Sequence, residues 1–231
     1  MSDTHASPAY THPLEQSVLN AQETFWQGRF GDDYVARNLP EAYLASNVAL
    51  FSRIFQNKVP PSHLLEWGAN VGQNLHAIQL LHPHARLSAC EINPTAIATL
   101  KANLPHVTLY AQSFREPMPL VSPLPDWLLC KLVLIHQPPE VLPTLYAQLL
   151  AQSQRYICIA EYYNPTPVEV CYRGHDEKLF KRDFAGELLT YANTHTNTPL
   201  KLIDYGFVYH GDSTFPQDDI TWFVLEKETA T

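Results

Sequence analysis

The chain has 231 residues, a formal net charge of −8 at pH 7 and four cysteines. This length is enough for one sizeable hydrophobic core with an appended segment. An acidic chain without a Lys or Arg cluster lacks the concentrated positive charge that nucleic acids require, so DNA and RNA are excluded as substrates. Because no signal segment opens the chain and no apolar run reaches the roughly 20 residues that span a bilayer, we expect a cytoplasmic protein without membrane contact.

The cysteines Cys90, Cys130, Cys158 and Cys171 show no C-x-x-C pairing, and the first three fall in strand-like apolar runs. Zinc sites and disulfide frameworks need closely spaced or matched cysteines. The sequence therefore predicts reduced cysteines in the core and no metal site.

The first 60 residues precede the regular pattern. Residues 1–13 are small, polar and proline-containing, which predicts a disordered tail. Helical spacing of apolar residues follows over 14–29, and aromatic, glycine and charged residues are then crowded over 25–38. Two interpretations stay open for this N-terminal helical cap, residues 14–60: a helix pair that packs its aromatic residues on the domain, or a lid that excludes water from a ligand.

Residues 40–58 predict a further helix, and the domain of residues 61–231 then alternates strand and helix, as parallel sheets require. Strands are expected at 63–67, 86–91, 107–111, 126–135 and 155–162, and helices at 72–81, 94–103, 138–153 and 183–194. A polar insertion covers 164–182. The last two strands, 200–210 and 221–227, are joined by a loop too short for a crossover helix, so they must pair antiparallel. The prediction is an α/β fold with a Rossmann-like, seven-stranded, mostly parallel sheet.

A ligand-binding turn is predicted between the first strand and the next helix. The strand ends at Glu66, and Gly68, Asn70 and Gly72 follow in the pattern E-x-G-x-x-x-G. Glycines let a ligand approach the backbone, and the N–H groups that open the helix attract an anionic group. The second strand ends at Glu91, 19 residues after Gly72, where Rossmann-like units place the carboxylate that binds ribose hydroxyls. The nicotinamide dinucleotide fingerprint is disfavoured, because Asn70 stands where its second glycine would be.

Candidate proton acceptors follow the fourth and fifth strands. They are His136, Glu161 and His175, with Tyr162 and Asp176 beside them. Ligands of open α/β sheets bind at the carboxyl edge, so these side chains are expected near the reacting atoms, where a base is needed if the acceptor loses a proton. For each histidine a structural role remains the alternative.

The ordered motifs resemble class I S-adenosylmethionine-dependent methyltransferases and, more narrowly, the methyltransferases associated with pseudaminic acid biosynthesis. The resemblance runs from Gln22 to Lys227 and is carried by 25–38, by 66–72, by Glu91-Ile92-Asn93, by 160–170, by Tyr172-Arg173-Gly174-His175, by 179–187, by Asp204-Tyr205-Gly206-Phe207 and by 218–223. Gln137-Pro138 departs from the Ile-Asn of that group, which leaves a changed acceptor open.

The resemblance implies S-adenosylmethionine as cofactor, S-adenosylhomocysteine as product and a class I methyltransferase fold. Its cofactor-binding residues would be Glu66, Gly68, Asn70 and Gly72 for methionine, Glu91 for ribose, Ser113 and Phe114 for adenine, Lys131 and Leu132 through their backbone, and Trp26, Tyr34 and Arg37 as a closing lid.

The acceptor is expected to be a small molecule, methylated at O or N. Arg37 and Arg173 suit a carboxylate, as in a nonulosonic acid or an amino acid. Substrate contacts are expected from Phe30, Tyr162, Tyr163, Asn164, Tyr172 and Arg173. The alternative is a regulatory or scaffold protein that binds the cofactor without turnover. Monomer and homodimer both stay open.

Overall fold

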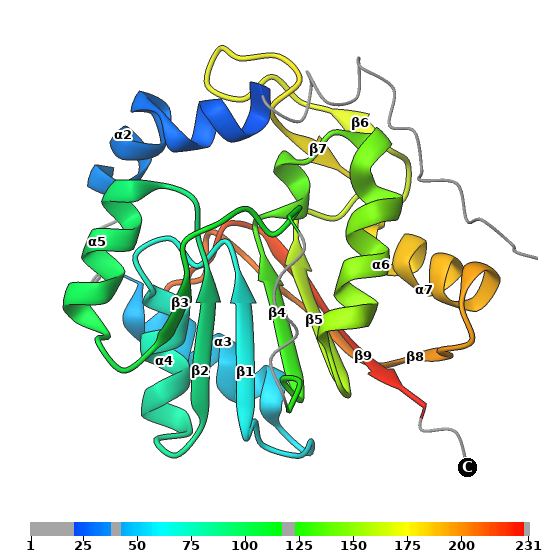
Figure 1. Cartoon of the computed structure of the whole chain (residues 1–231). Helices are drawn as coiled ribbons and strands as arrows, with labels where there is room; N and C mark the ends of the chain where they lie inside the picture. The colour runs from blue at the N-terminus through cyan, green and yellow to red at the C-terminus, as the bar shows by residue number, and fades with distance from the viewer. Residues whose placement is uncertain (1–20, 38–42, 117–122, 229–231) are drawn as a thin grey trace, which may run out of the picture.

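A seven-stranded sheet forms the centre of the computed structural model, which describes residues 21–37, 43–116 and 123–228 (Figure 1). The strands are β1 (His63–Trp67), β2 (Arg86–Cys90), β3 (Thr108–Tyr110), β4 (Trp127–Lys131), β5 (Tyr156–Glu161), β8 (Leu200–Val208) and β9 (Ile220–Lys227), in the order β3-β2-β1-β4-β5-β9-β8. The first five pair in parallel, and β9 runs antiparallel to both β5 and β8. The predicted sheet and its terminal antiparallel pair are confirmed.

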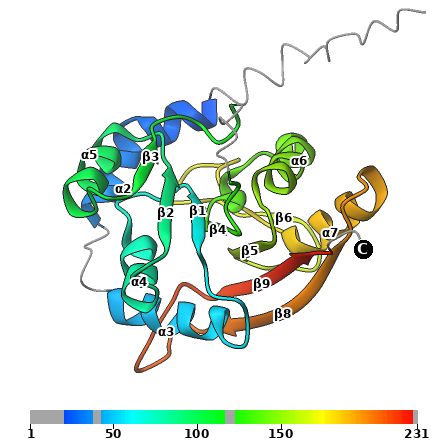
Figure 2. The same ribbon diagram turned by 60° about the horizontal axis from the view of Figure 1, so that its bottom comes forward.

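Helices cover both faces of this sheet, as a sheet buried on both sides requires. The helices α3 (Leu44–Phe55) and α4 (Gln73–Leu81) pack against each other on one face, and α6 (Leu142–Gln152) and α7 (Phe184–His195) lie on the other (Figure 2). The remaining helix of the sheet, α5 (Pro94–Asn103), directs Leu100 into the same core as α3 and α4. Within the described residues, none of these helices is both long and apolar enough to cross a membrane.

The N-terminal segment differs from the prediction. Residues 14–29 were expected to form one helix that runs into a crowded aromatic segment, but residues 21–27 are helical and a second helix, α2 (Arg29–Arg37), follows after a break at Gly28. Helix α3 packs on the sheet, so within the described part of the predicted cap it is residues 21–37 that lie above the carboxyl ends of the strands (Figure 1). We call residues 21–37 the roof segment. The predicted tail, residues 1–13, lies outside the described residues.

The polar insertion also lies above this edge, where the strands β6 (Val168–Glu169) and β7 (Phe180–Lys181) form a small hairpin (Figure 1). The fourth strand ends earlier than expected, because residues after Lys131 turn into a 3-10 helix, η1 (Leu134–His136), and a second one, η2 (Pro139–Val141), precedes α6. All four cysteines are free thiols. Three are buried in the sheet, whereas Cys171 is exposed, so the core location expected for it is wrong.

Candidate functional site

The turn after β1 has the tight geometry that its glycines predict. Gly68 has φ +64°, and a Cβ there would lie 2.6 Å from Cγ2 of Val133. Its N–H donates to the carbonyl of Cys90 at 2.8 Å, which ties the turn to β2. Gly72, with φ +84°, caps the start of α4. At Gly68 and Gly72 a residue with a side chain would be strained, because both have a positive φ. Without side chains at these two positions, the backbone of the turn is accessible to a ligand.

Glu91 organises the end of β2. Its Oε1 accepts the N–H groups of Ile92 and Asn93, each at 2.8 Å, and its Oε2 accepts the N–H of Asn70 at 2.7 Å. Burial raises the pKa of Glu91, and the backbone N–H groups oppose that shift. The carboxylate therefore links the two turns predicted to bind one ligand. Its Oε1 already accepts two N–H groups, whereas its Oε2 accepts one and retains a lone pair for a further hydrogen bond.

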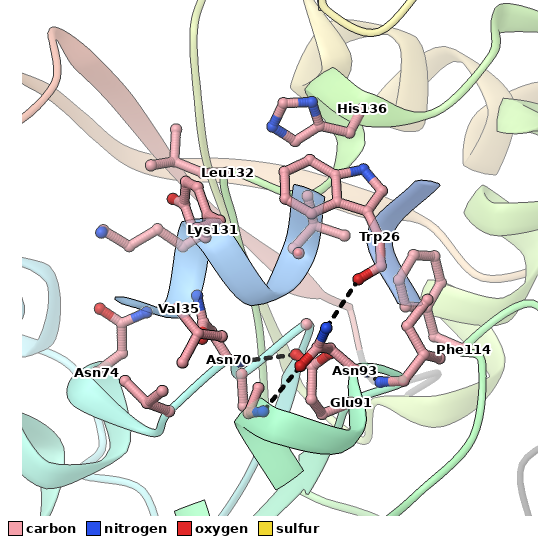
Figure 3. Close-up of a pocket in the computed structure, with 18 of the residues that line it drawn as sticks. Trp26, Val35, Asn70, Asn74, Glu91, Asn93, Phe114, Lys131, Leu132 and His136 are labelled. Carbon is pink, nitrogen blue, oxygen red and sulfur yellow. Dashed lines mark hydrogen bonds between the residues drawn. The ribbon is translucent and has the colours of Figure 1, made fainter. Parts of the chain in front are cut away.

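A cavity lies above these turns, under the roof segment (Figure 3). Its lining includes these predicted residues: Trp26, Tyr34, Gly68, Asn70, Glu91, Ser113, Phe114, Lys131, Leu132 and His136. Glu66 and Gly72 are not among the residues that line it. The roof is fixed from the β2 side, where Asn93 donates to the carbonyl of Trp26 at 3.1 Å and to Asp32 of α2 at 3.2 Å. Residues from six elements of the chain thus converge on one site.

Several buried polar atoms at this cavity have no hydrogen-bond partner among the described residues. They are Oε2 of Glu66, Oδ1 of Asn70, Nε1 of Trp26 and Oε1 of Gln22. Buried polar groups are nearly always paired, because an unpaired one costs about 1–3 kcal/mol. Oε2 of Glu66 and Oδ1 of Asn70 are two unpaired acceptors at the glycine turn. They fit a ligand that approaches the turn and donates hydrogen bonds to it.

The side of the cavity near β3 presents an aromatic surface. Phe114 lies in the cavity wall and stacks on Trp67, with ring centroids 5.0 Å apart and planes 11° apart. Beside it, Arg115 donates from Nε to Oε1 of Gln137 at 3.0 Å. A flat ring next to polar groups can hold a planar heterocycle such as adenine.

His136 is buried beside Trp26, with ring centroids 4.6 Å apart (Figure 3). Its Nδ1 lies 2.7 Å from the carbonyl oxygen of Lys178, which can only accept, so Nδ1 carries the proton. Burial lowers the pKa of His136 to about 4. The ring is therefore neutral at physiological pH, and its Nε2 offers a lone pair.

Glu161 has a different environment. Its Oε1 accepts the N–H groups of Val133 and Leu134, each at 2.9 Å, and its Oε2 accepts the N–H of Ile135 at 3.4 Å. Burial raises the pKa of Glu161 to about 7, and these N–H groups oppose the shift. The carboxylate caps the 3-10 turn after β4 and does not line the cavity, so its geometry gives it a structural task.

His175 lies in an aromatic cluster outside the cavity. Its exposed ring is 5.1 Å from Phe25 and 5.7 Å from Phe30, and Phe30 is 5.8 Å from Tyr172. The guanidinium of Arg173 lies over the Tyr172 ring at 5.8 Å, in an exposed turn with φ +51°. This cluster joins the roof segment to the insertion, one layer outside Trp26 and His136.

The other predicted substrate residues lie further from the cavity lining. Tyr162 is half-buried and packs against both cores, and burial raises its pKa. Tyr163 is exposed beside Phe223, and the side-chain amide of Asn164 donates to the carbonyl of Thr166. The side chain of Arg37 is outside the described part of the chain.

The sequence did not single out some of the lining. These residues are Asn47, Asn74, Arg115, Gln217 and Asp218, of which Asp218 appeared only as part of a resemblance. Gln137, noted as a departure from that resemblance, also lines the cavity. They come from α3, α4 and loops, including the loop between β8 and β9. Isolated amide and charged side chains carry no spacing signal, so only the folded arrangement reveals them.

Comparisons with known proteins identify the fold of this chain. The sequence matches no protein-family model and no curated protein. Among solved structures, 1,6-didemethyltoxoflavin-N1-methyltransferase of Burkholderia thailandensis, determined with 1,6-didemethyltoxoflavin and S-adenosylhomocysteine, is 16% identical with a TM-score of 0.65, over 97% of this chain and 94% of that one.

Two further solved structures agree. The N-methyltransferase NodS from Bradyrhizobium japonicum is 16% identical with a TM-score of 0.61, over 83% of this chain and 100% of its own. Magnesium protoporphyrin IX methyltransferase from Synechocystis, with bound S-adenosylmethionine, is 12% identical with a TM-score of 0.62, over 96% and 100%. The chain therefore has the class I methyltransferase fold.

Proposed function

We propose that the chain is an S-adenosylmethionine-dependent methyltransferase that methylates a small molecule at O or N. The observation that carries this proposal is the cavity at the carboxyl edge, where the glycine turn, Glu91 and Phe114 converge in a class I methyltransferase fold. The neighbouring enzymes with bound S-adenosylhomocysteine or S-adenosylmethionine support it.

The residues fit this cofactor. Oε2 of Glu91 would accept a hydrogen bond from a ribose hydroxyl. Phe114, whose other face stacks on Trp67, would stack on adenine. Glu66 and Asn70 retain unpaired acceptors on the methionine side. When bound, the cofactor supplies an activated methyl group on a sulfonium.

We propose that the roof segment acts as a lid. Trp26 covers the cavity and is fastened on one side to Asn93 and on the other, through Phe25 and Phe30, to the insertion. Such a cover excludes water and fixes the acceptor near the methyl group, which is the main requirement of an in-line displacement.

We propose His136 as the group that accepts the hydrogen bond from the acceptor. Its Nε2 carries a lone pair, because Nδ1 donates to Lys178. A hydroxyl or amine that donates to Nε2 is oriented with its own lone pair toward the methyl group, and the proton can pass to this nitrogen as the new bond forms. The other two sequence candidates are placed differently. The carboxylate of Glu161 accepts hydrogen bonds from backbone N–H groups, and the ring of His175 is exposed.

For the acceptor we propose a small carboxylate-bearing metabolite, such as a nonulosonic acid or an amino acid. Arg37 at the end of α2 and Arg173 in the insertion are the support from the sequence. Arg115, which lies in the cavity wall itself, adds a guanidinium on the described surface.

The test combines binding with turnover. Calorimetry with S-adenosylmethionine and S-adenosylhomocysteine should give micromolar affinity, and Glu91→Ala should abolish it, whereas Glu140→Ala on the exposed surface should not. A labelled-methyl assay across nonulosonic acids, amino acids and small carboxylates then identifies the acceptor. Binding without transfer to any acceptor would support the non-catalytic alternative, and absence of binding would refute the proposal.

A further inference from the structure

The roof segment brings two buried polar atoms to the cavity. Gln22 and Trp26 both line it, and both belong to the helical residues 21–27. Residues four apart in a helix share one face, so the two side chains reach the cavity from the same side. Oε1 of Gln22 and Nε1 of Trp26 have no hydrogen-bond partner among the described residues. Neither atom takes part in the cofactor contacts proposed above.

The side-chain amide of Gln22 has one possible orientation. Gln22 is only 3% exposed, and the end of its side chain lies 2.6 Å from the carbonyl oxygen of Glu177 in the insertion. A carbonyl oxygen can only accept a hydrogen bond, so the amide atom that faces Glu177 must be the donor Nε2. The other end of the amide, Oε1, is therefore the one available to the cavity, and it can only accept.

The next carbonyl along the chain orients His136 in the same way. Nδ1 of His136 donates to Lys178, which directly follows Glu177, and Nε2 keeps a lone pair. Because consecutive carbonyls hold the two side chains, Gln22 and His136 lie at the same end of the cavity, and each directs a hydrogen-bond acceptor into it. The indole ring of Trp26 lies beside the His136 ring (Figure 3).

Two acceptors at one end of the cavity fit a ligand that carries two donors. A molecule with a single hydroxyl or amine pairs with His136 and leaves the buried Oε1 of Gln22 without a partner, which is unfavourable. A second hydroxyl or amine close to the first pairs with both. Since a hydroxyl oxygen also accepts, the same ligand can take the N–H of Trp26.

We infer that Gln22 is a specificity-determining residue that selects methyl acceptors with a second hydroxyl or amine close to the methylated one, as in a vicinal diol or an amino alcohol. This inference rests on the proposed function, in which His136 receives the hydrogen bond from the methylated group. It narrows the substrate class, because a nonulosonic acid with neighbouring hydroxyls fits, whereas an amino acid fits only if its side chain carries a hydroxyl.

Two pairs of probes that differ by one hydroxyl test this selection. They are catechol against phenol, and cis-1,2-cyclohexanediol against cyclohexanol. Their affinities for the protein saturated with S-adenosylhomocysteine are measured by nitrogen-15 NMR of the Trp26 indole signal, which is assigned with Trp26→Phe. We expect the diol of at least one pair to bind about 10- to 100-fold more tightly than its mono-alcohol, because the mono-alcohol leaves one buried acceptor unpaired. Gln22→Met should reduce this preference to within about threefold.

Gln27→Met, at an exposed position of the same helix, is the matched control and should keep the preference. Gln22→Leu serves if circular dichroism shows that Gln22→Met disturbs folding. The inference would be overturned if the wild-type complex bound no probe or bound both members of each pair equally, or if the preference survived Gln22→Met. Failure of the wild-type protein to bind S-adenosylhomocysteine would instead overturn the proposed function, so the two failures are distinguishable.

Discussion

Glu161→Gln tests whether the buried carboxylate at the end of β5 holds the turn after β4 or acts on a ligand. Glutamine keeps an oxygen for the N–H groups of Val133 and Leu134 but turns its own amide donors toward the N–H of Ile135. Hydrogen bonds to charged groups are worth about 1.5–3 kcal/mol each, so we expect the free energy of unfolding to fall by about 2 kcal/mol.

Glu161→Ala should cost more, about 4 kcal/mol, because it leaves all three N–H groups without a partner. Urea unfolding at constant pH, followed by tryptophan fluorescence, measures both values. Glu140→Gln on the exposed surface is the control and should stay within about 0.5 kcal/mol of wild type. If Glu161→Gln unfolded like wild type but lost methyl transfer by more than about 100-fold, a loss in the range expected for a missing base, the structural reasoning would be refuted.

Gly68→Ala should lower the free energy of unfolding by about 1–3 kcal/mol and weaken the binding of S-adenosylhomocysteine, because alanine is strained at φ +64° and its Cβ would lie 2.6 Å from Val133. An unchanged urea midpoint and an unchanged affinity would contradict this expectation. Because burial lowers the pKa of His136 to about 4, its ring should remain in the neutral Nδ1–H form from about pH 5.5 to 8, and nitrogen-15 NMR showing a transition near its ordinary pKa of 6.5 would disprove that. Burial raises the pKa of Glu66 from 4.5 to about 7, so the folded protein keeps a proton that the unfolded chain releases, and this contribution to stability falls as pH rises through that window. The free energy of unfolding of wild type minus that of Glu66→Gln should therefore fall by up to about 1.4 kcal/mol per pH unit in urea unfolding, and a value that rose with pH would exclude a raised pKa.

The sheet could be predicted because local pattern and global order agree. Apolar runs ending in Glu66 and Glu91 mark strands whose carboxyl ends share one edge, and the short loop before β9 forces an antiparallel pair. Strand and helix bounds on the sheet mostly agree to within two residues. The main error lies after Lys131, where an apolar sequence continues but the backbone turns, since Glu161 supplies acceptors for its N–H groups.

The site was harder to predict than the sheet. Strand alternation could have placed Glu161, because Ile157 and Ile159 point to the α6 face and Glu161 follows on the same side, away from Lys131. His136 was found from its position after a strand, but its tautomer depends on a carbonyl 42 residues away. Asn74 and Gln217 lie in no motif, and they meet only because α4 and the β8–β9 loop pack at one edge.

The contact between Gln217 and Asn47 joins residues 170 positions apart, and it has a consequence for the order of events during synthesis. The strands β1 to β5 can pair while the rest of the chain is still being synthesised. The loop that carries Gln217 reaches its position only when β9 inserts between β5 and β8. A nascent chain stalled before β9 should therefore contain the glycine turn and Glu91 and still lack one wall of its cavity. Ligand capture would begin only as the final strand pairs, and it would then stabilise the newly completed sheet by mass action.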